Sequence, residues 1–345
     1  REVINDVELL LRLTRKPVML VTGTNGKSTV VSLLEHILNY CGVNAVACGN
    51  NGVAALKACQ ASPDMFVLEL SSYQLENLVS LSSVSAVVLN IGADHLARYE
   101  NMTEYMAVKN RIYTGADYPV YPVDREGDTT YEKAIAGYAI RRKDHQITYL
   151  LAEDGILKNG KPFCSFEDIG LSGNHNYLNV CASLALMESL SLPRDRMIES
   201  LLDYRGLQHR MEKVCTDSLG RQWINDSKST NLHSLEAALL ARKTPVCLIM
   251  GGEGKGENYA DVLERYADRI GALIAYGKDA ELIYSSAKSI PERTRVHAVS
   301  QAVVEAGKQT SDVLFSPACA SFDQYRDFNE RGDDFKAQVK LVALC

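Results

Sequence analysis

The stretch Gly23-Thr24-Asn25-Gly26-Lys27-Ser28-Thr29 constrains the fold of this chain more than any other feature. It follows an apolar run over residues 17–22, which is typical of a buried strand, and it leads into residues 29–41, whose apolar positions recur at helical spacing. A glycine turn between strand and helix points backbone N–H groups at a ligand, and the helix N-terminus adds partial positive charge. The pattern therefore predicts a phosphate-binding loop, the alternative being an ordinary glycine turn that caps a helix.

Within this loop, Lys27 offers a mobile positive charge to the β- and γ-phosphates of a nucleotide, and Ser28 or Thr29 offers a hydroxyl to Mg²⁺. The spacing is shorter than G-x-x-x-x-G-K-[ST], because Val21 stands where that pattern has its first glycine. The formal net charge of −6 disfavours nucleic acid as the main partner. Phosphate binding must therefore come from local groups.

Strand-like runs alternate with helical patterns, which predicts two doubly wound α/β domains with mainly parallel sheets. In a central P-loop-type ATP-binding domain, residues 1–206, we expect strands over 17–22, 43–48, 65–70 and 85–91, and helices over 29–41, 52–60, 73–80, 101–113, 174–190 and 193–204. In a C-terminal Rossmann-like domain, residues 207–345, we expect strands over 222–225, 245–250, 271–276, 294–297 and 312–316, and helices over 232–242, 258–268, 279–288, 299–308 and 331–343. Residues 116–172 carry short runs between turn signals and predict a small antiparallel region.

No run reaches 18 apolar residues, so we expect no membrane insertion. The nine cysteines form no C-x-x-C pair and lie mostly in apolar runs, which favours reduced, buried thiols in a cytoplasmic protein. The chain begins with Arg1 and not Met, so we expect it to be a trimmed or partial chain.

Polar residues follow several predicted strands of the first domain. Glu69 ends one apolar run and is a candidate Mg²⁺ ligand, the alternative being a capping or surface glutamate. His95 follows another run and alone is a weak signal for a metal or substrate contact. Lys109 lies inside a predicted helix, where a solvent-facing lysine is the simpler interpretation. Asn176 and Asn179 start a helix and either contact a nucleobase or cap the helix.

In the second domain, Arg210 is a candidate contact to a transferring phosphoryl group, since a guanidinium fork fits its oxygens. Three polar, glycine- or serine-rich loops, residues 225–231, 251–256 and 316–321, each follow a predicted strand. Open α/β sheets place their ligand sites at the carboxyl ends of strands, so these loops predict one ligand-binding rim.

With these residues in view, the chain resembles the Mur ligases, ATP-dependent amide ligases of peptidoglycan synthesis, over about residues 5 to 340. The family marks are Gly23–Thr29, Glu69, His95, His175–Asn179 and His209-Arg210. Residues 69–76, 225–231 and 316–324 resemble the members that add D-glutamate to UDP-N-acetylmuramoyl-L-alanine, and differ from folylpolyglutamate synthetases.

The resemblance implies that ATP phosphorylates the muramoyl-alanine carboxylate and that the amine of D-glutamate attacks the acyl phosphate. It implies two Mg²⁺ ions and a carbamylated Lys109, in place of the solvent-facing interpretation. By motif, the nucleotide contacts are Gly23, Thr24, Asn25, Gly26, Lys27, Ser28, Thr29, Asn176, Asn179, Arg210 and Asp226; the metal ligands are Ser28, Glu69, His95 and Lys109; and the substrate contacts are Asn50, Ser71, Thr230, Lys255, Ser321 and Phe328. Lys27, His95, Lys109 and Arg210 are the residues implied in catalysis.

Compared with the family pattern, we expect the N-terminal UDP-binding domain to be missing from this chain, and Ala97 and Glu253 stand where other residues are more common. Alternatives are therefore an ATP-binding core unable to ligate, a folylpolyglutamate synthetase-like ligase, or a two-domain module that only binds a nucleotide. We expect a monomer that acts on small molecules.

Overall fold

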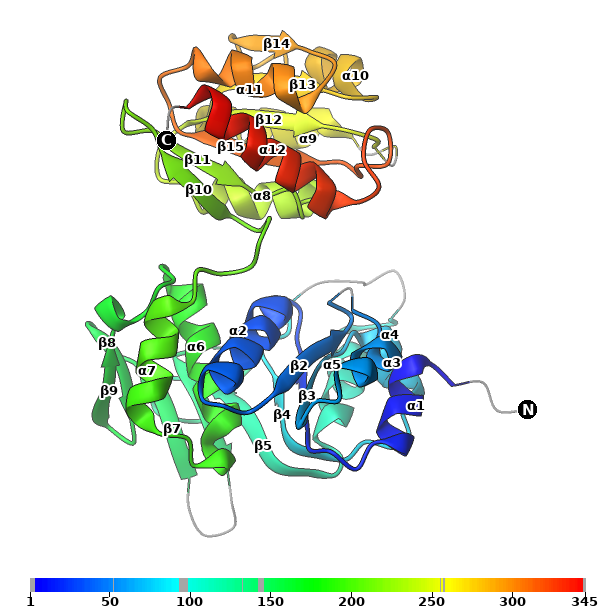
Figure 1. The fold of residues 1–345 in the computed structure, drawn as a ribbon, viewed down its shortest axis with the longest axis vertical. Coiled ribbons are helices and arrows are strands. Elements are labelled where there is room, and N and C mark those ends of the chain that lie inside the picture. The colour runs from blue at the N-terminus through cyan, green and yellow to red at the C-terminus, as the bar shows by residue number, and fades with distance from the viewer. Residues whose placement is uncertain are drawn as a thin grey trace. The chain divides into compact units, whose positions relative to one another are not determined.

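The computed structural model describes residues 4–51, 53–92, 99–131, 133–141, 146–254, 256 and 258–343. The chain forms two compact units, which meet in sequence between Gly206 and Leu207 (Figure 1). No helix of the described ranges is long and apolar enough to cross a membrane.

The first unit contains one nine-stranded sheet. Its strands are β1 (Val18–Thr22), β2 (Ala45–Gly49), β3 (Met65–Glu69), β4 (Ser83–Val88), β5 (Ala116–Val123), β6 (Gly137–Arg141), β7 (Gln146–Leu151), β8 (Gly155–Lys158) and β9 (Lys161–Ser165). Their order is β2-β3-β1-β4-β5-β6-β7-β8-β9, with parallel pairs as far as β5 and antiparallel pairs beyond it. The predicted parallel sheet is confirmed for strands β2-β3-β1-β4-β5, and the antiparallel region extends that sheet.

Helices cover both faces of this sheet (Figure 1). They are α1 (Asp6–Leu13), α2 (Lys27–Tyr40), α3 (Ala55–Ala58), α4 (Ser72–Asn77), α5 (Met102–Asn110), α6 (Asn174–Met187) and α7 (Arg194–Asp203), with short 3-10 turns after several of them. Side chains of a strand alternate between faces. Met19 and Val21 accordingly pack with α2, α6 and α7, whereas Val18 and Leu20 pack with α1, α3 and α4. The fold is therefore doubly wound, as predicted.

Helix α1 lies outside the predicted elements. The side chain of Asn5 caps it by accepting from the Glu8 N–H at 2.8 Å. The buried Glu8 carboxylate accepts from Arg12 Nε at 2.7 Å, from the Val79 and Ser80 N–H groups at 2.9 and 3.1 Å, and from the Ser80 hydroxyl at 2.8 Å. Burial alone would raise the pKa of Glu8, but these donors lower it to about 2. The helix is thus held by contacts distant in sequence, which periodicity does not reveal.

The second unit contains a six-stranded sheet of order β10-β11-β15-β12-β13-β14, in which only the edge pair β10 and β11 is antiparallel. The strands are β10 (Glu212–Thr216), β11 (Gln222–Asn225), β12 (Val246–Gly251), β13 (Ile270–Tyr276), β14 (Arg293–Arg295) and β15 (Val313–Ala318). Helices α8 (Leu232–Leu240), α9 (Tyr259–Arg265) and α10 (Ala280–Ser286) cover one face, and α11 (Val299–Gly307) and α12 (Phe328–Val342) cover the other.

Three details of the second unit differ from expectation. Helix α12 begins three residues earlier than the predicted 331, because the Asp327 side chain caps it through the N–H groups of Asn329 and Glu330. Edge strand β10 was not among the predicted elements. Cys215 in β10 is disulfide-bonded, so the expectation of reduced thiols is wrong there. Spacing along the chain does not show which cysteines meet in space.

Candidate functional site

The glycine-rich loop follows β1, which lies between β3 and β4 in the parallel part of the sheet. Gly26 is the N-cap residue of α2 and has φ +86°, a left-handed conformation that favours glycine. A Cβ at Gly26 would lie 2.6 Å from Asn179 Oδ1, so the Asn179 side chain is packed against the loop. As a glycine, Gly26 has no side chain to cap the helix, and the first turn of α2 contains no acidic residue. This helix N-terminus therefore fits an anion such as phosphate.

Asn90, which belongs to no recognised motif, holds the loop in place. Its Oδ1 accepts from the Asn25 N–H at 2.9 Å, its Nδ2 donates to the Asn25 carbonyl at 3.0 Å, and its own carbonyl accepts from the Thr24 N–H at 3.0 Å. The available signal was a polar residue directly after an apolar run.

Lys27 folds back over the loop. Its Nζ donates to the carbonyls of Gly23 at 2.8 Å and Thr24 at 2.7 Å. Ser28 is half-buried, whereas Thr29 is buried. Ser28 is thus the more accessible of the two candidate hydroxyls for Mg²⁺.

Glu69, at the end of β3, is the best-placed candidate metal ligand of the first unit. Its side chain is buried, with Oε1 accepting from Asn50 Nδ2 at 3.0 Å. Within the described ranges, Oε2 is buried without a hydrogen-bond partner. A buried carboxylate oxygen left unsatisfied is costly, and a divalent cation would satisfy it. His95 lies outside the described residues, and the described ranges contain no cluster of three acidic, histidine or cysteine ligands.

Lys109 of α5 is 2% exposed, so the simple interpretation of a solvent-facing lysine is wrong. Its Nζ donates to the Gly23 carbonyl at 3.0 Å and to Thr22 Oγ1 at 3.3 Å, and lies 4.8 Å from the centre of the Tyr105 ring. Helix α5 therefore brings a buried amine to the first residue of the glycine-rich loop.

Two other predicted residues of the first unit make local contacts. Asn176 Nδ2 donates to the Ser172 carbonyl at 2.8 Å at the start of α6. Ser71 caps α4 by accepting from the Gln74 N–H at 3.2 Å. Of the two helix-start asparagines, Asn179 is the one that lies against Gly26 of the loop.

In the second unit, strands β11, β15 and β12 are neighbours, so the three predicted polar loops leave the same edge of the sheet side by side. Asp226, directly after β11, links two of them. Its Oδ2 accepts from the Ser316 hydroxyl at 2.8 Å, and its Oδ1 from the Met211 N–H at 3.2 Å. Burial raises the pKa of Asp226 to about 7, although these donors and the nearby Arg210 act in the opposite direction.

The other predicted residues of this rim differ in exposure. Ser321 is buried, Thr230 and Phe328 are half-buried, and Arg210 is exposed. Lys228 Nζ lies 5.9 Å from the centre of the Phe328 ring. Lys255 lies outside the described residues.

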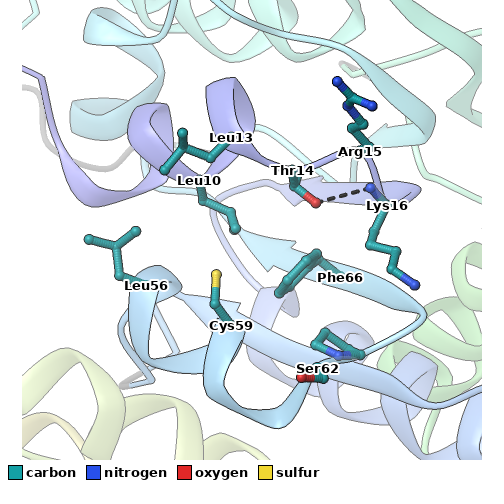
Figure 2. A pocket seen from close by; sticks show the side chains of 10 residues that line it. Leu10, Leu13, Thr14, Arg15, Lys16, Leu56, Cys59, Ser62 and Phe66 are labelled. Atoms are coloured by element: carbon teal, nitrogen blue, oxygen red, sulfur yellow. Dashed lines mark hydrogen bonds between the residues drawn. The ribbon is translucent and has the colours of Figure 1, made fainter.

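A cavity of about 360 Å³ lies elsewhere in the first unit, near the residues where β1 and β3 begin. Figure 2 shows apolar Leu10 and Phe66 in its lining, together with Arg15 and Lys16. No predicted site residue lines it, so this cavity is separate from the glycine-rich loop.

Comparisons with known proteins identify the family of the chain. The model of the Mur ligase middle domain matches residues 21–187, and that of the Mur ligase, glutamate ligase domain matches residues 209–319. The UDP-N-acetylmuramoylalanine–D-glutamate ligase of Alcanivorax borkumensis is 37% identical over 100% of this chain and 79% of its own length. The chain belongs to the Mur ligase family. The Escherichia coli K12 protein of the same name is 35% identical over 98% of this Mur ligase and 79% of its own length.

Solved Mur ligases share the fold. The alanine ligase MurC of Thermotoga maritima has a TM-score of 0.66 at 20% identity, covering 97% of this chain and 78% of its own. MurF of the same organism, solved with ADP, has a TM-score of 0.59 at 16% identity, and the match covers 97% of this chain and 82% of the MurF chain. Mur ligases are ATP-dependent, ADP-forming amide ligases of peptidoglycan precursor synthesis that use Mg²⁺, and this chain is such a ligase.

Proposed function

We propose that this Mur ligase joins D-glutamate to the carboxylate of UDP-N-acetylmuramoyl-L-alanine. The observation that carries the proposal is the identity of 35–37% over 98–100% of the chain with relatives named for that reaction. It extends through both units, and so includes the glycine-rich loop and the rim of polar loops.

In the first unit, the α2 N-terminus and Lys27 would bind the phosphates of ATP, and Ser28 and Glu69 would hold Mg²⁺. The unsatisfied Glu69 Oε2 supports this role, since it has the chemistry of a divalent-cation ligand. ATP, when bound, supplies the phosphoryl group that activates the substrate carboxylate. Asn50, which donates to Glu69, would link this carboxylate to the muramoyl substrate. Packed against Gly26, Asn179 would contact the adenine side of the nucleotide.

Lys109 would carry a carbamate and so become an anionic ligand for a second Mg²⁺. The neutral amine would attack the carbon of CO₂: the C–N bond forms, one C=O π bond breaks to leave a carboxylate oxygen, and one proton passes from the nitrogen to solvent. The buried position of Nζ, 3.0 Å from the Gly23 carbonyl oxygen of the glycine-rich loop, supports this proposal. ¹³C-bicarbonate NMR should show a carbamate signal that is absent in Lys109→Arg. Equal spectra of the two proteins would contradict the carbamate and leave the ligase assignment intact.

In the second unit, the rim of polar loops would bind D-glutamate. Thr230, Ser321, Phe328 and Lys255 would line its pocket, and Asp226 would contact the ribose. The exposed guanidinium of Arg210 would contact the transferring phosphoryl group, since its planar fork matches phosphate oxygens.

The decisive experiment measures phosphate release from Mg²⁺-ATP with UDP-N-acetylmuramoyl-L-alanine and D-glutamate, added separately and together. We expect release only when both are present, with L-glutamate as the matched negative control. Release without the muramoyl substrate, or no release, would favour an ATP-binding core unable to ligate.

A folylpolyglutamate synthetase-like ligase is the second candidate. Such an enzyme of Thermotoga maritima has a TM-score of 0.59 at 15% identity, which shows a shared fold alone. Replacing the muramoyl substrate by a folate and D-glutamate by L-glutamate in the same assay distinguishes the two, and we expect no release.

A further inference from the structure

Arg331, in the first turn of α12, is completely buried and was not singled out by its sequence pattern. Its guanidinium donates from Nε to Ser227 Oγ at 3.0 Å and from Nη2 to the Ser227 carbonyl at 2.7 Å. Its Nη1 donates to the Cys319 carbonyl at 3.0 Å. One planar group therefore joins the loop after β11 to the loop after β15.

The third loop of the rim lies against the same guanidinium. A Cβ at Gly252 would lie 3.2 Å from Arg331 Nη1 and 2.3 Å from the Ala320 carbonyl oxygen, at a φ of +126°. The backbones of Glu253 and Ala320 also exchange two hydrogen bonds, of 2.9 and 3.0 Å. Glycine at position 252 thus allows the loop after β12 to close onto the guanidinium and the loop after β15.

Arg331 also connects the rim to the start of its own helix. Ser227 Oγ, which accepts from Arg331 Nε, donates to the carbonyl of Phe328 at 2.8 Å. Residues Thr230, Ser321 and Phe328, the proposed D-glutamate contacts, therefore belong to segments that meet at Arg331.

The contacts of Arg331 suit arginine and not lysine. All three partner oxygens are formally uncharged, and they are reached in different directions by Nε, Nη1 and Nη2. A lysine keeps the charge but has one compact ammonium group, so it cannot reproduce a rigid fork of donors.

We propose that Arg331 is a positioning residue that holds the three loops in the arrangement needed for the amino-acid acceptor. It acts through the loops and does not itself touch the substrate. This inference rests on the proposed function, because it assumes that D-glutamate binds at this rim.

Arg331→Lys tests the proposal, with Arg221→Lys as the matched control. Arg221 is also a buried arginine of the second unit. It donates to Asp217 at 2.7 Å and to the carbonyls of Gly307 and Gln309, and none of these hydrogen bonds within the described residues reaches the three loops. A purely structural role predicts similar effects of the two substitutions.

We expect Arg331→Lys to raise KM for D-glutamate by about tenfold or more, since small misplacements of binding groups have large kinetic effects. KM for ATP should change by less than about twofold. Arg221→Lys should leave both KM values near those of the wild type, even where it lowers the melting temperature. The proposal would be overturned if the ratio of the KM for D-glutamate to the KM for ATP were the same in Arg331→Lys and in Arg221→Lys.

Hydrogen–deuterium exchange provides a readout that needs no substrate. The Ser229 and Ala320 N–H groups donate to Asp226 and Glu253 within the rim, at 2.9 and 3.0 Å. Arg331→Lys should accelerate their exchange, and Arg221→Lys should not. Unchanged exchange in Arg331→Lys would refute the positioning role. Wild-type protein without D-glutamate-dependent phosphate release would instead refute the proposed function and leave the exchange result standing.

Discussion

Alanine at Gly26 tests whether the glycine-rich loop needs glycine for backbone freedom alone or also for space. Gly42, at the other end of α2, is a matched control. The two residues have φ angles of +86° and +87°, but a Cβ at Gly42 meets nothing within 4 Å, whereas one at Gly26 lies 2.6 Å from Asn179 Oδ1. A Cβ at Gly26 would also lie 3.4 Å from Leu89 Cδ1, which is an ordinary contact, so a difference between the two variants points to the closer contact with Asn179.

Both alanines must adopt a left-handed conformation, which costs about 1–2 kcal/mol. Reduced freedom of the unfolded chain offsets this by about 0.4–1 kcal/mol. We therefore expect Gly42→Ala to lower the free energy of unfolding by about 1 kcal/mol. Gly26→Ala must also rotate Asn179 away from its position, which adds about 0.5–1.5 kcal/mol.

The same displacement should weaken nucleotide binding, because Asn179 is the proposed adenine-side contact. Titration with a fluorescent ATP analogue should give a Kd about tenfold higher for Gly26→Ala, equivalent to about 1.4 kcal/mol, and unchanged for Gly42→Ala. Denaturant unfolding measures the stability difference. In a protein that already carries Asn179→Ala, Gly26→Ala should lower the free energy of unfolding by no more than Gly42→Ala does. Equal losses of stability and affinity in the two glycine variants would refute the steric argument.

Two further predictions concern buried carboxylates. Glu8→Gln should lower the free energy of unfolding by about 2–3 kcal/mol at neutral pH, since the folded pKa is about 2 against 4.5 ordinarily; the loss should shrink as pH falls toward 2, and pH-dependent denaturation measures it. Asp226 has its pKa raised from 3.8 to about 7, so the folded state retains a proton that the unfolded chain has released, and stability should fall as pH rises through this window. Asp226→Asn should remove this fall in the free energy of unfolding. Urea unfolding of both proteins at about pH 5 and about pH 8 measures it, and an equal fall in Asp226→Asn would contradict the prediction.

Local sequence signals predicted the parallel sheets because buried strands and amphipathic helices have distinct periods. The glycine-rich loop was also predictable, since its residues are contiguous and its conformation depends on Gly26. Helix α1 and strand β10 were not, because Glu8 reaches residues 79 and 80, and β10 pairs only at the sheet edge.

The less predictable site residues act through the tertiary structure. Periodicity does not distinguish Lys109 from a surface lysine, since only the packing of α5 beneath the glycine-rich loop buries it. Asn90 and Arg331 carry no motif of their own, and their roles become visible through backbone groups that they contact far along the chain.

The position of β15 determines when the rim of polar loops can form during synthesis. β15 is the last strand of the chain, yet it lies between β11 and β12, which are made much earlier. Until residues 313–318 leave the ribosome, the loops after β11 and β12 lack the strand between them, and Arg331 of α12 follows later still. Such pairing over long sequence separations is slow to form. A chain interrupted before β15 could complete its glycine-rich loop and still have no assembled rim of polar loops. The ability to bind a nucleotide would then precede the ability to use it.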